Sequence, residues 1–158
     1  MSNARKDNIC LYIMLLLFGL LMILSACTTE SKPIDPTQQQ RMSELRKRFK
    51  NELGEKYDLS IPAATAAQLK RGAELYPQVC ASCHGGRGDG LGKISEGLAG
   101  NPTSFTDPEQ AAFFSERARL GIIRKGVPGT PMMGWQNVLT EEDIQALYCY
   151  IRSLIGQK

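Results

Sequence analysis

The sequence predicts an all-helical fold on three observations. After Thr140, apolar residues recur every three or four positions, which puts them on one face of a helix against a core. These residues are Ile144, Leu147, Tyr148, Ile151 and Ile155. Residues typical of helix starts precede the helical stretches, and Thr140 and Asp143 have the spacing of a capping box, with Asp in place of the usual Glu. No stretch alternates polar and apolar residues as a half-buried strand does.

The compact domain is expected to span residues 63–158, and its first helix residues 66–76, with Thr65 as N-cap. Pro77 is expected to interrupt or kink this helix, because proline lacks the N–H that a helix needs. The following segment is rich in glycine, which suits a tight loop better than a regular element. The glycines are Gly85, Gly86, Gly88, Gly90, Gly92, Gly97 and Gly100.

Two further helices are expected before the last one. Asp107 followed by Pro108 predicts a helix start, because proline is favoured at the first helical position. A second helix is predicted over residues 115–125, ending at Gly126. Residues 127–135 contain prolines and glycines and predict an ordered loop.

The N-terminus has the three parts of a secretory signal. Arg5 and Lys6 precede an apolar run over residues 9–24, and the small residues Ser25 and Ala26 follow it. The run is shorter than the roughly 20 residues that span a bilayer comfortably as a helix. We therefore expect the rest of the chain to be exported.

The residues at the end of this run, Leu24-Ser25-Ala26-Cys27, resemble the bacterial lipobox, whose cysteine is acylated. This resemblance implies a signal peptide over residues 1–26 and a lipid anchor on Cys27. The alternative is an uncleaved signal anchor in which the cysteine is incidental. In either case we expect a membrane-anchored protein that faces the periplasm or the outer cell surface.

Residues 27–62 are expected to form a membrane tether. Residues 28–40 are polar and are expected to be extended or disordered. Residues 41–57 predict a helix with a narrow apolar stripe. That helix either docks on a partner complex or a membrane surface, or rests on the compact domain. The stripe consists of Met42, Leu45, Phe49 and Leu53.

The charge does not indicate a nucleic-acid-binding protein. The formal net charge is +3, and +2 remains after residues 1–27 are removed. A modest preference for an anionic protein partner stays open. A basic group could meet such a partner or simply be solvated. It consists of Arg117, Arg119, Arg124 and Lys125.

The strongest motif is Cys80-Ala81-Ser82-Cys83-His84, which has the C-x-x-C-H spacing of c-type haem attachment. Two thiols three residues apart can add to the two vinyl groups of one porphyrin edge. The histidine that follows is then placed beneath the iron. We therefore predict one covalently bound haem c.

Three other interpretations of the motif fit less well. A thioredoxin-like C-x-x-C needs a βαβ context, which the sequence lacks. A structural zinc site needs four ligands, and it would have to combine the adjacent Cys83 and His84 with Cys80 and the distant Cys149. A plain disulfide leaves His84 and the glycine-rich loop unexplained.

The second axial ligand is expected to be a methionine. His84 is the only histidine in the sequence, so ligation by two histidines of this chain is excluded. After export the chain keeps Met42 in the tether and Met132 and Met133 in the loop over residues 127–135. Ligation by histidine and methionine leaves no open iron site, which favours electron transfer over chemistry on a substrate.

These features resemble the class I cytochrome c family over residues 63–156. The resemblance implies a few helices wrapped around one covalently attached haem. The matching residues are Gly72, Tyr76, the Cys80–His84 motif, Asn101, Pro102, Thr130, Pro131, Met132, Trp135 and the stretch 147–154.

The same resemblance implies roles for particular residues. Met132, directly after Pro131, is the implied iron ligand, and Met133 then packs in the haem pocket. Family members often have proline where Met133 stands, so the double methionine departs from the pattern. Pro102 is expected to offer its carbonyl to the ring N–H of His84, which would orient the imidazole.

Three residues outside the motif also have expected places. The resemblance also implies that Gly72 lets the first helix cross the last closely, near Tyr150, and the cost of a glycine within a helix agrees with such a packing role. Trp135 is expected to pack beside the haem, with a hydrogen bond to a propionate as the lesser alternative. Cys149, which has no obvious partner, is expected to be a buried packing residue rather than a redox group.

The predicted function is that of a monohaem electron carrier without enzymatic activity. The iron would cycle between Fe(II) and Fe(III), serving a membrane respiratory chain as a shuttle or complex subunit. Expected partners are redox proteins or respiratory complex subunits and, through Cys27, the membrane, with no nucleic acid and no small-molecule substrate. The alternatives are a haem peroxidase or gas sensor with a displaceable methionine, and a thiol–disulfide lipoprotein without haem.

Overall fold

A computed structural model describes residues 35–157, and among these the only β-type pairing is one isolated bridge between Gly126 and Met133. The helices are α2 (Pro36–Leu53), α3 (Ala66–Val79), α4 (Ala81–His84), α5 (Pro108–Ala112), α6 (Glu116–Lys125) and α7 (Glu141–Ser153), with 3-10 turns η1 (Gly54–Lys56) and η2 (Ser95–Gly97). The all-helical prediction is confirmed. The predicted signal peptide and Cys27 lie outside the described residues.

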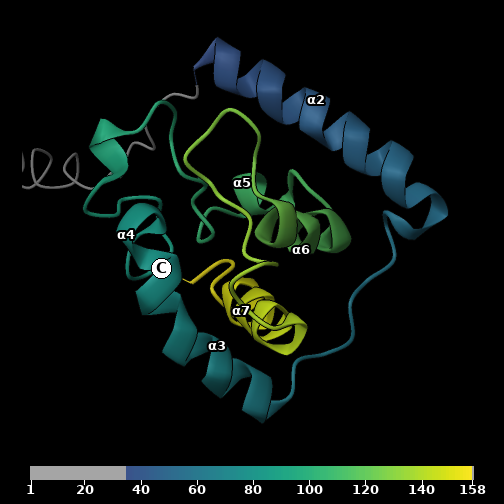
Figure 1. Cartoon of the computed structure of the whole chain (residues 1–158), viewed down its shortest axis with the longest axis vertical. Coiled ribbons are helices and arrows are strands. Elements are labelled where there is room, and N and C mark those ends of the chain that lie inside the picture. Colours follow the sequence, from purple (N-terminus) through teal and green to yellow (C-terminus); the bar gives the residue numbers. More distant parts are fainter. Residues whose placement is uncertain (1–34, 158) are drawn as a thin grey trace, which may run out of the picture. The chain divides into compact units, whose positions relative to one another are not determined.

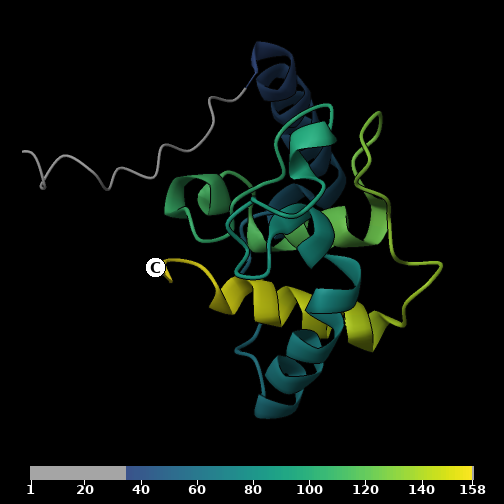
Figure 2. The same ribbon diagram turned by 90° about the vertical axis from the view of Figure 1, so that its left-hand side faces the viewer.

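The crossing of α3 and α7 organises the fold. Figure 1 shows α7 end-on beside α3, and Figure 2 shows α7 passing across it. A Cβ added at Gly72 would come within 2.2 Å of the Ala146 carbonyl oxygen and 2.6 Å of the Tyr150 Cβ, so only glycine allows this approach. Tyr76, one turn later, packs against Tyr150 with ring centroids 5.3 Å apart. The close crossing predicted for Gly72 is confirmed.

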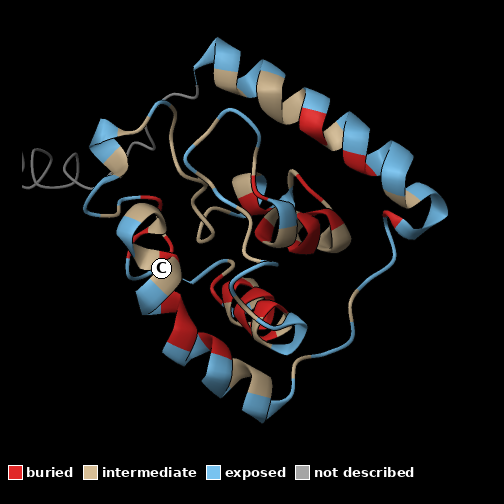
Figure 3. Ribbon diagram, viewed as in Figure 1, coloured by how far each residue is buried: buried red, intermediate tan, exposed pale blue. Residues whose placement is uncertain are grey.

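Buried apolar side chains from α3, α6 and α7 form the main core, as the burial colours of Figure 3 show. The predicted face of the last helix is confirmed, except that Ile155 lies beyond the helix end at Ser153 and is half-buried. Burying one large apolar side chain stabilises a fold by about 1.5–3 kcal/mol. The core residues are Leu75, Tyr76, Cys80, Leu120, Ile123, Ile144, Leu147, Tyr148, Ile151 and Leu154.

The predicted helix starts are confirmed, because the expected side chains cap the N-termini. Thr65 accepts from the Gln68 N–H and forms a full capping box with it. At α7 the box is only half formed. The Thr140 hydroxyl accepts from the Asp143 N–H, but the Asp143 carboxylate pairs with Arg71 instead of accepting from the Thr140 N–H. The other caps are Asp107 and Ser115, and α6 ends at Gly126 as predicted.

The predicted interruption of the first helix at Pro77 is wrong. α3 continues through Pro77 to Val79. A proline within a helix removes one donor, its own N–H. The next turn closes again, because the Cys80 N–H donates to the Tyr76 carbonyl at 2.9 Å. As a result, α3 leads directly into the cysteine motif.

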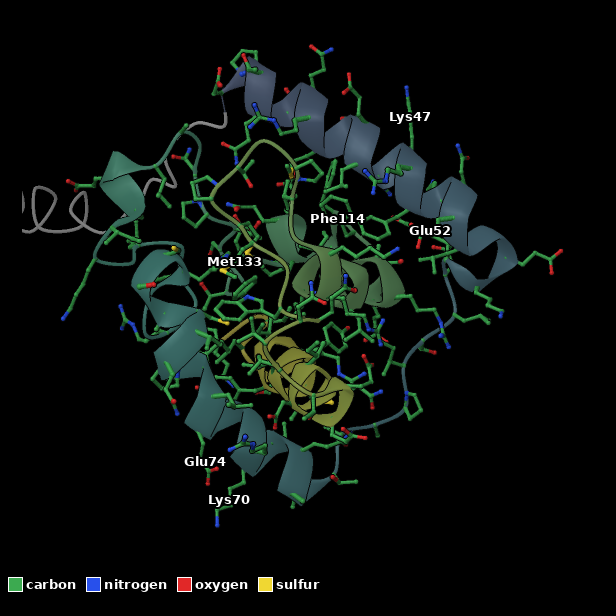
Figure 4. The ribbon with its side chains drawn as sticks, in the orientation of Figure 1. Lys47, Glu52, Lys70, Glu74, Phe114 and Met133 are labelled. Atoms are coloured by element: carbon green, nitrogen blue, oxygen red, sulfur yellow. The ribbon has the colours of Figure 1, made fainter. Side chains whose placement is uncertain are left out.

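The expectation of an extended segment up to residue 40 is also wrong for its last residues. α2 begins at Pro36, where Asp35 caps the helix and proline occupies the first turn. Its apolar stripe buries Leu45 and Phe49 in a second cluster with Tyr57, Phe114 and Ala118. Figure 4 shows Phe114 on the side of α6 that faces α2. The helix therefore rests on the compact domain, in agreement with one of the two interpretations above.

The segment between α2 and α3 is held by charged side chains of α6 and α7. Glu116 accepts from the Ile61 N–H at 2.6 Å, and Arg117 donates to the Leu59 carbonyl at 3.0 Å. Arg152 donates to the carbonyls of Ile61 and Pro62 and also pairs with Glu116 at 3.2 Å. We call residues 36–62 the N-terminal strap.

All described residues belong to one compact unit, which therefore includes the N-terminal strap. The boundary expected at residue 63 therefore falls inside the unit. Between residues 35 and 157, no helix combines the length and the apolar character that crossing a bilayer requires.

Candidate functional site

The cysteine motif forms a single helical turn at the end of α3. The His84 N–H donates to the Cys80 carbonyl at 2.9 Å, and the Cys83 N–H donates to the same oxygen at 3.2 Å. Side chains three and four residues apart share one face of a helix. The turn therefore presents both thiols and the imidazole on the same side. Neither thiol takes part in a disulfide.

The environment of Cys80 differs from that of a redox-active thiol. Its side chain belongs to the main core and is 8% exposed. Burial, and then the nearby Cys83, raise the pKa of the Cys80 thiol to about 12. Thiols that exchange disulfides have a lowered pKa and an accessible sulfur. The geometry therefore argues against the thiol–disulfide interpretation.

His84 is held as a neutral imidazole. Its Nδ1 lies 3.0 Å from the Thr103 carbonyl oxygen, and its ring stacks on Phe105 with centroids 4.6 Å apart. A carbonyl can only accept, so Nδ1 carries the proton and Nε2 keeps a free electron pair. Burial lowers the pKa of His84, although the hydrogen bond to Thr103 opposes this. A neutral imidazole with a free Nε2 is a metal ligand.

The expected acceptor for His84 was the carbonyl of Pro102, and the structure corrects it to that of Thr103. The Pro102 carbonyl lies against Gly90 instead, where an added Cβ would come within 2.8 Å of it. The two carbonyls therefore have different neighbours, and the one that faces the imidazole is that of Thr103. Thr103 and Phe105, two residues apart, both face His84.

The glycine-rich segment forms a tight loop, as predicted, and this loop folds back onto the motif. The N–H groups of Gly90, Gly92 and Ile94 donate to the carbonyls of His84, Cys83 and Ser82 at 2.8, 3.1 and 3.1 Å. A Cβ at Gly92 would come within 2.2 Å of the Ser82 carbonyl oxygen. This close backbone contact requires glycine.

The methionine loop is fixed against the end of α6. The Val127 N–H donates to the Met132 carbonyl at 2.8 Å, and the Met132 N–H donates to the Thr130 hydroxyl at 3.2 Å. The Trp135 N–H donates to the Ile123 carbonyl at 3.0 Å, and its indole packs against the main core. The predicted ordered loop over residues 127–135 is confirmed.

The two methionines of this loop differ in exposure. Met132 is half-buried, whereas Met133 is 52% exposed. In the view of Figure 4, Met133 lies between the loop and α4. The loop thus places two thioethers within one short, well-anchored segment.

Exposed apolar side chains are concentrated in the segments next to the motif and the methionine loop. Four of the five large hydrophobic residues that are exposed in the described part of the chain follow the motif or border the methionine loop. A covalently attached haem takes two thiols, which add to its vinyl groups, and a neutral imidazole and a thioether as iron ligands. The four residues are Leu91, Ile94, Met133 and Val138.

Sequence reasoning missed two residues of this site, Thr103 and Phe105. Thr103 carried no side-chain signal, because it meets His84 through its main-chain carbonyl, which every residue has. The resemblance instead directed attention to Pro102. Nothing local indicated which carbonyl of this segment meets His84, because the contact joins residues 19 positions apart.

Cys149 and the basic group lie outside the site, and both make contacts within the fold. Cys149 is 3% exposed, so its predicted burial is confirmed. In the basic group, Arg124 and Lys125 pair with Glu141 and Glu52, and the Arg119 guanidinium lies over the Tyr148 ring. With Arg117 bound to the strap, these cations do not form a free basic patch.

The chain was compared with known proteins. The family model described as Cytochrome c matches residues 69–154. Cytochrome c55X of Stutzerimonas stutzeri is 34% identical over 95 residues, covering 58% of this chain and 73% of that protein. Cytochrome c6 of Thermosynechococcus vestitus (strain NIES-2133 / IAM M-273 / BP-1) is 31% identical over 90 residues, covering 57% and 73%.

Among solved structures, one chain of the Kuenenia stuttgartiensis reducing HAO-like protein complex Kustc0457/Kustc0458 is similar, with a TM-score of 0.52 and 25% identity. The match covers 61% of this chain and 48% of that chain, so this chain spans about half the length of that structure. Together with the motif, the free Nε2 of His84 and the helical fold, the comparisons show a covalently bound haem c. The chain belongs to the cytochrome c family of electron-transfer haem proteins.

Proposed function

We propose that Cys80 and Cys83 hold the haem through thioethers and that His84 and Met132 are its axial ligands. The observation that carries this proposal is the hydrogen bond from His84 Nδ1 to the Thr103 carbonyl, at 3.0 Å. It fixes the tautomer and leaves Nε2 as the free ligand atom. Met132 is preferred over Met133, because Pro131 stiffens the backbone directly before it.

When bound, the haem supplies one-electron Fe(II)/Fe(III) chemistry. The residues of this chain keep the ligand set constant. Thr103 and Phe105 hold the ring of His84 in one orientation. The backbone bonds of the methionine loop to α6 hold the thioether in place. Ligands that do not have to rearrange favour fast electron exchange over binding of a substrate.

We therefore propose an electron carrier rather than an enzyme. A haem peroxidase or gas sensor needs an open or easily vacated iron position. Two thioethers in one ordered loop favour an occupied position. Reduced native protein is expected not to bind carbon monoxide readily, and ready binding together with high-spin iron would contradict this proposal.

The ligand assignment is tested by the ferric spectra of Met132→Ala and Met133→Ala. The two variants remove the same side chain from adjacent positions of one loop, so each is the control of the other. Met132→Ala is expected to lose the charge-transfer band of the methionine–iron bond, and Met133→Ala to keep it. The reverse result would assign the ligand to Met133.

We further propose that the protein is a lipoprotein anchored through Cys27 that serves a membrane respiratory chain from the periplasm or the outer cell surface. Support comes from the basic residues, the apolar run and the small residues that precede Cys27. The similarity to a chain of a multi-protein complex supports a role as a complex subunit. Its partners would be redox proteins.

Mass spectrometry of the protein isolated from membranes tests the anchor. A mature N-terminus at Cys27 that carries acyl chains is expected. A chain that still begins at Met1 would contradict the lipid anchor and favour the signal-anchor alternative. The proteins that co-purify with the detergent-solubilised form then identify the redox partners.

A further inference from the structure

The N-terminal strap reaches the segment that holds His84. Near the start of α2, the Gln38 side-chain amide donates to the Asn101 carbonyl and accepts from the Asn101 N–H, both at 2.8 Å. The two bonds join residues 63 positions apart. The Gln38 amide therefore pairs with one backbone unit as a neighbouring strand would.

This pair lies next to the acceptor for the haem ligand. Asn101 is separated from Thr103 by Pro102 alone, and the Thr103 carbonyl accepts from His84 Nδ1 at 3.0 Å. Proline fixes one backbone dihedral between them and restricts the residue before it. These restrictions limit how far a shift of the Asn101 peptide can be absorbed before it reaches the Thr103 carbonyl.

The rest of the strap gives Gln38 a fixed position. Leu45 and Phe49 are 7% and 4% exposed where they pack on the cluster that includes Phe114. At the far end, the Tyr57 hydroxyl accepts from the Ser115 N–H at 3.4 Å. Figure 1 shows α2 running along the edge of the compact unit as one straight element. The contact at Asn101 is thus made by a helix that is held along its length.

We propose that Gln38 is a positioning residue for the haem, which sets the orientation of His84 through Asn101 and the Thr103 carbonyl. This role goes beyond the proposed function, and it belongs to a helix that lies outside residues 69–154, the part matched by the family. The hydrogen bond that Nδ1 donates makes the imidazole a stronger donor to iron and so favours the ferric state. Loosening the Thr103 carbonyl is therefore expected to raise the reduction potential.

The test compares Gln38→Leu with Gln39→Leu in the full-length haem protein. Both changes remove one amide from adjacent positions of α2 and alter no charge. Leucine has no thioether, so it adds no competing ligand. Gln39 is exposed, whereas the two bonds to the Asn101 backbone come from Gln38. Gln38→Ala is a second variant with a smaller side chain.

Two quantities are measured, the reduction potential and the hydrogen exchange of the Asn101 amide. Gln38→Leu and Gln38→Ala are expected to raise the potential and to speed Asn101 exchange by about tenfold, the effect of losing a hydrogen bond of about 1.4 kcal/mol. Gln39→Leu is expected to leave both unchanged. The methionine charge-transfer band is expected to persist in all three variants.

Each other outcome overturns the proposal. Faster exchange with an unchanged potential would make the contact a purely structural one. Equal shifts in the Gln38 and Gln39 variants would indicate a general effect of altering the helix, and unchanged exchange would mean that the pair does not form. A wild-type protein without low-spin covalent haem would instead contradict the proposed function, so the two failures are distinguishable.

Discussion

The two proposed axial ligands are held in different ways. His84 ends the cysteine turn, which is in contact with the glycine-rich loop and with residues 101–105, and this last segment is bound to the start of α2 through Asn101. The methionine loop is held through backbone bonds to the last turns of α6. Disturbing α6 should therefore affect the methionine, whereas the histidine depends on contacts spread over the chain.

The largest expected effect comes from Phe49→Ala, which removes the support behind α6. Phe49 is 4% exposed, and truncating a buried phenylalanine costs about 3–5 kcal/mol. We expect the free energy of unfolding in denaturant to fall by about 3 kcal/mol and the methionine charge-transfer band to disappear at a lower temperature. Leu59→Ala is the control, because Leu59 is 54% exposed and should change stability by less than about 0.5 kcal/mol.

Gly92→Ala tests the packing of the glycine-rich loop on the cysteine turn that carries His84. The new Cβ would come within 2.2 Å of the Ser82 oxygen and 2.5 Å of the Cys83 carbonyl carbon, both backbone atoms of the cysteine turn. Overpacking against atoms that cannot rotate away is expected to cost about 2–3 kcal/mol in urea unfolding. Gly97→Ala has open space around it and should be nearly neutral. Equal costs in the two variants would refute the tight loop.

Gly134→Ala tests the packing of the methionine loop on the end of α6 in the same way. Its Cβ would come within 2.5 Å of the Arg124 carbonyl oxygen and 2.6 Å of the Lys125 carbonyl carbon, at the end of α6. We expect a loss of about 1–2 kcal/mol together with a weakened charge-transfer band. Gly92→Ala should keep that band. If both variants weakened it equally, the two loops would not be independent.

The smallest effect concerns Glu116, at the start of α6. Burial alone would raise the pKa of this carboxyl, but the Ile61 N–H and Arg152 outweigh it and hold the pKa below the ordinary 4.5. The unfolded chain therefore takes up this proton at a higher pH than the folded one. The stability that Glu116 contributes is present above about pH 4.5 and is lost as the pH falls through the lower folded pKa.

Glu116→Gln should therefore flatten the decline of unfolding free energy between neutral and acidic pH. The measurement is urea unfolding at a series of pH values. Glu109→Gln is a suitable control, because Glu109 is an exposed acid in the first turn of α5. An unchanged slope in the Glu116 variant would mean that the contact with the strap contributes nothing to the pH dependence.

Much of the fold was predictable because its signals are local. The caps at Thr65, Ser115 and Thr140 bond to N–H groups three residues away, so a short window of sequence contains both partners. The cysteine motif likewise lies within one helical turn. Gly72 was predictable for a different reason, since the family resemblance implies a close helix crossing there and a glycine inside a helix is costly without such a neighbour.

The errors have an equally physical cause. Pro77 weakens a helix locally, but packing of the helix against α7 and the closing bond at Cys80 compensate for it. The start of α2 is polar and lacks the apolar periodicity that predicts a helix, although Asp35 followed by Pro36 is typical of a helix start. For Pro77, the packing against α7 is a contact that a short window of sequence does not contain, whereas for α2 the local signal was present but short.

The sequence by itself determined the covalent haem site, because the attachment chemistry needs two thiols and a histidine within five consecutive residues. It also determined the helical fold through capping and periodicity. Only the tertiary structure decided that Thr103 rather than Pro102 meets His84, and that Gln38 pairs with Asn101. These contacts join residues 19 and 63 positions apart, and which of several equivalent carbonyls or amides meets a partner depends on how the whole chain packs.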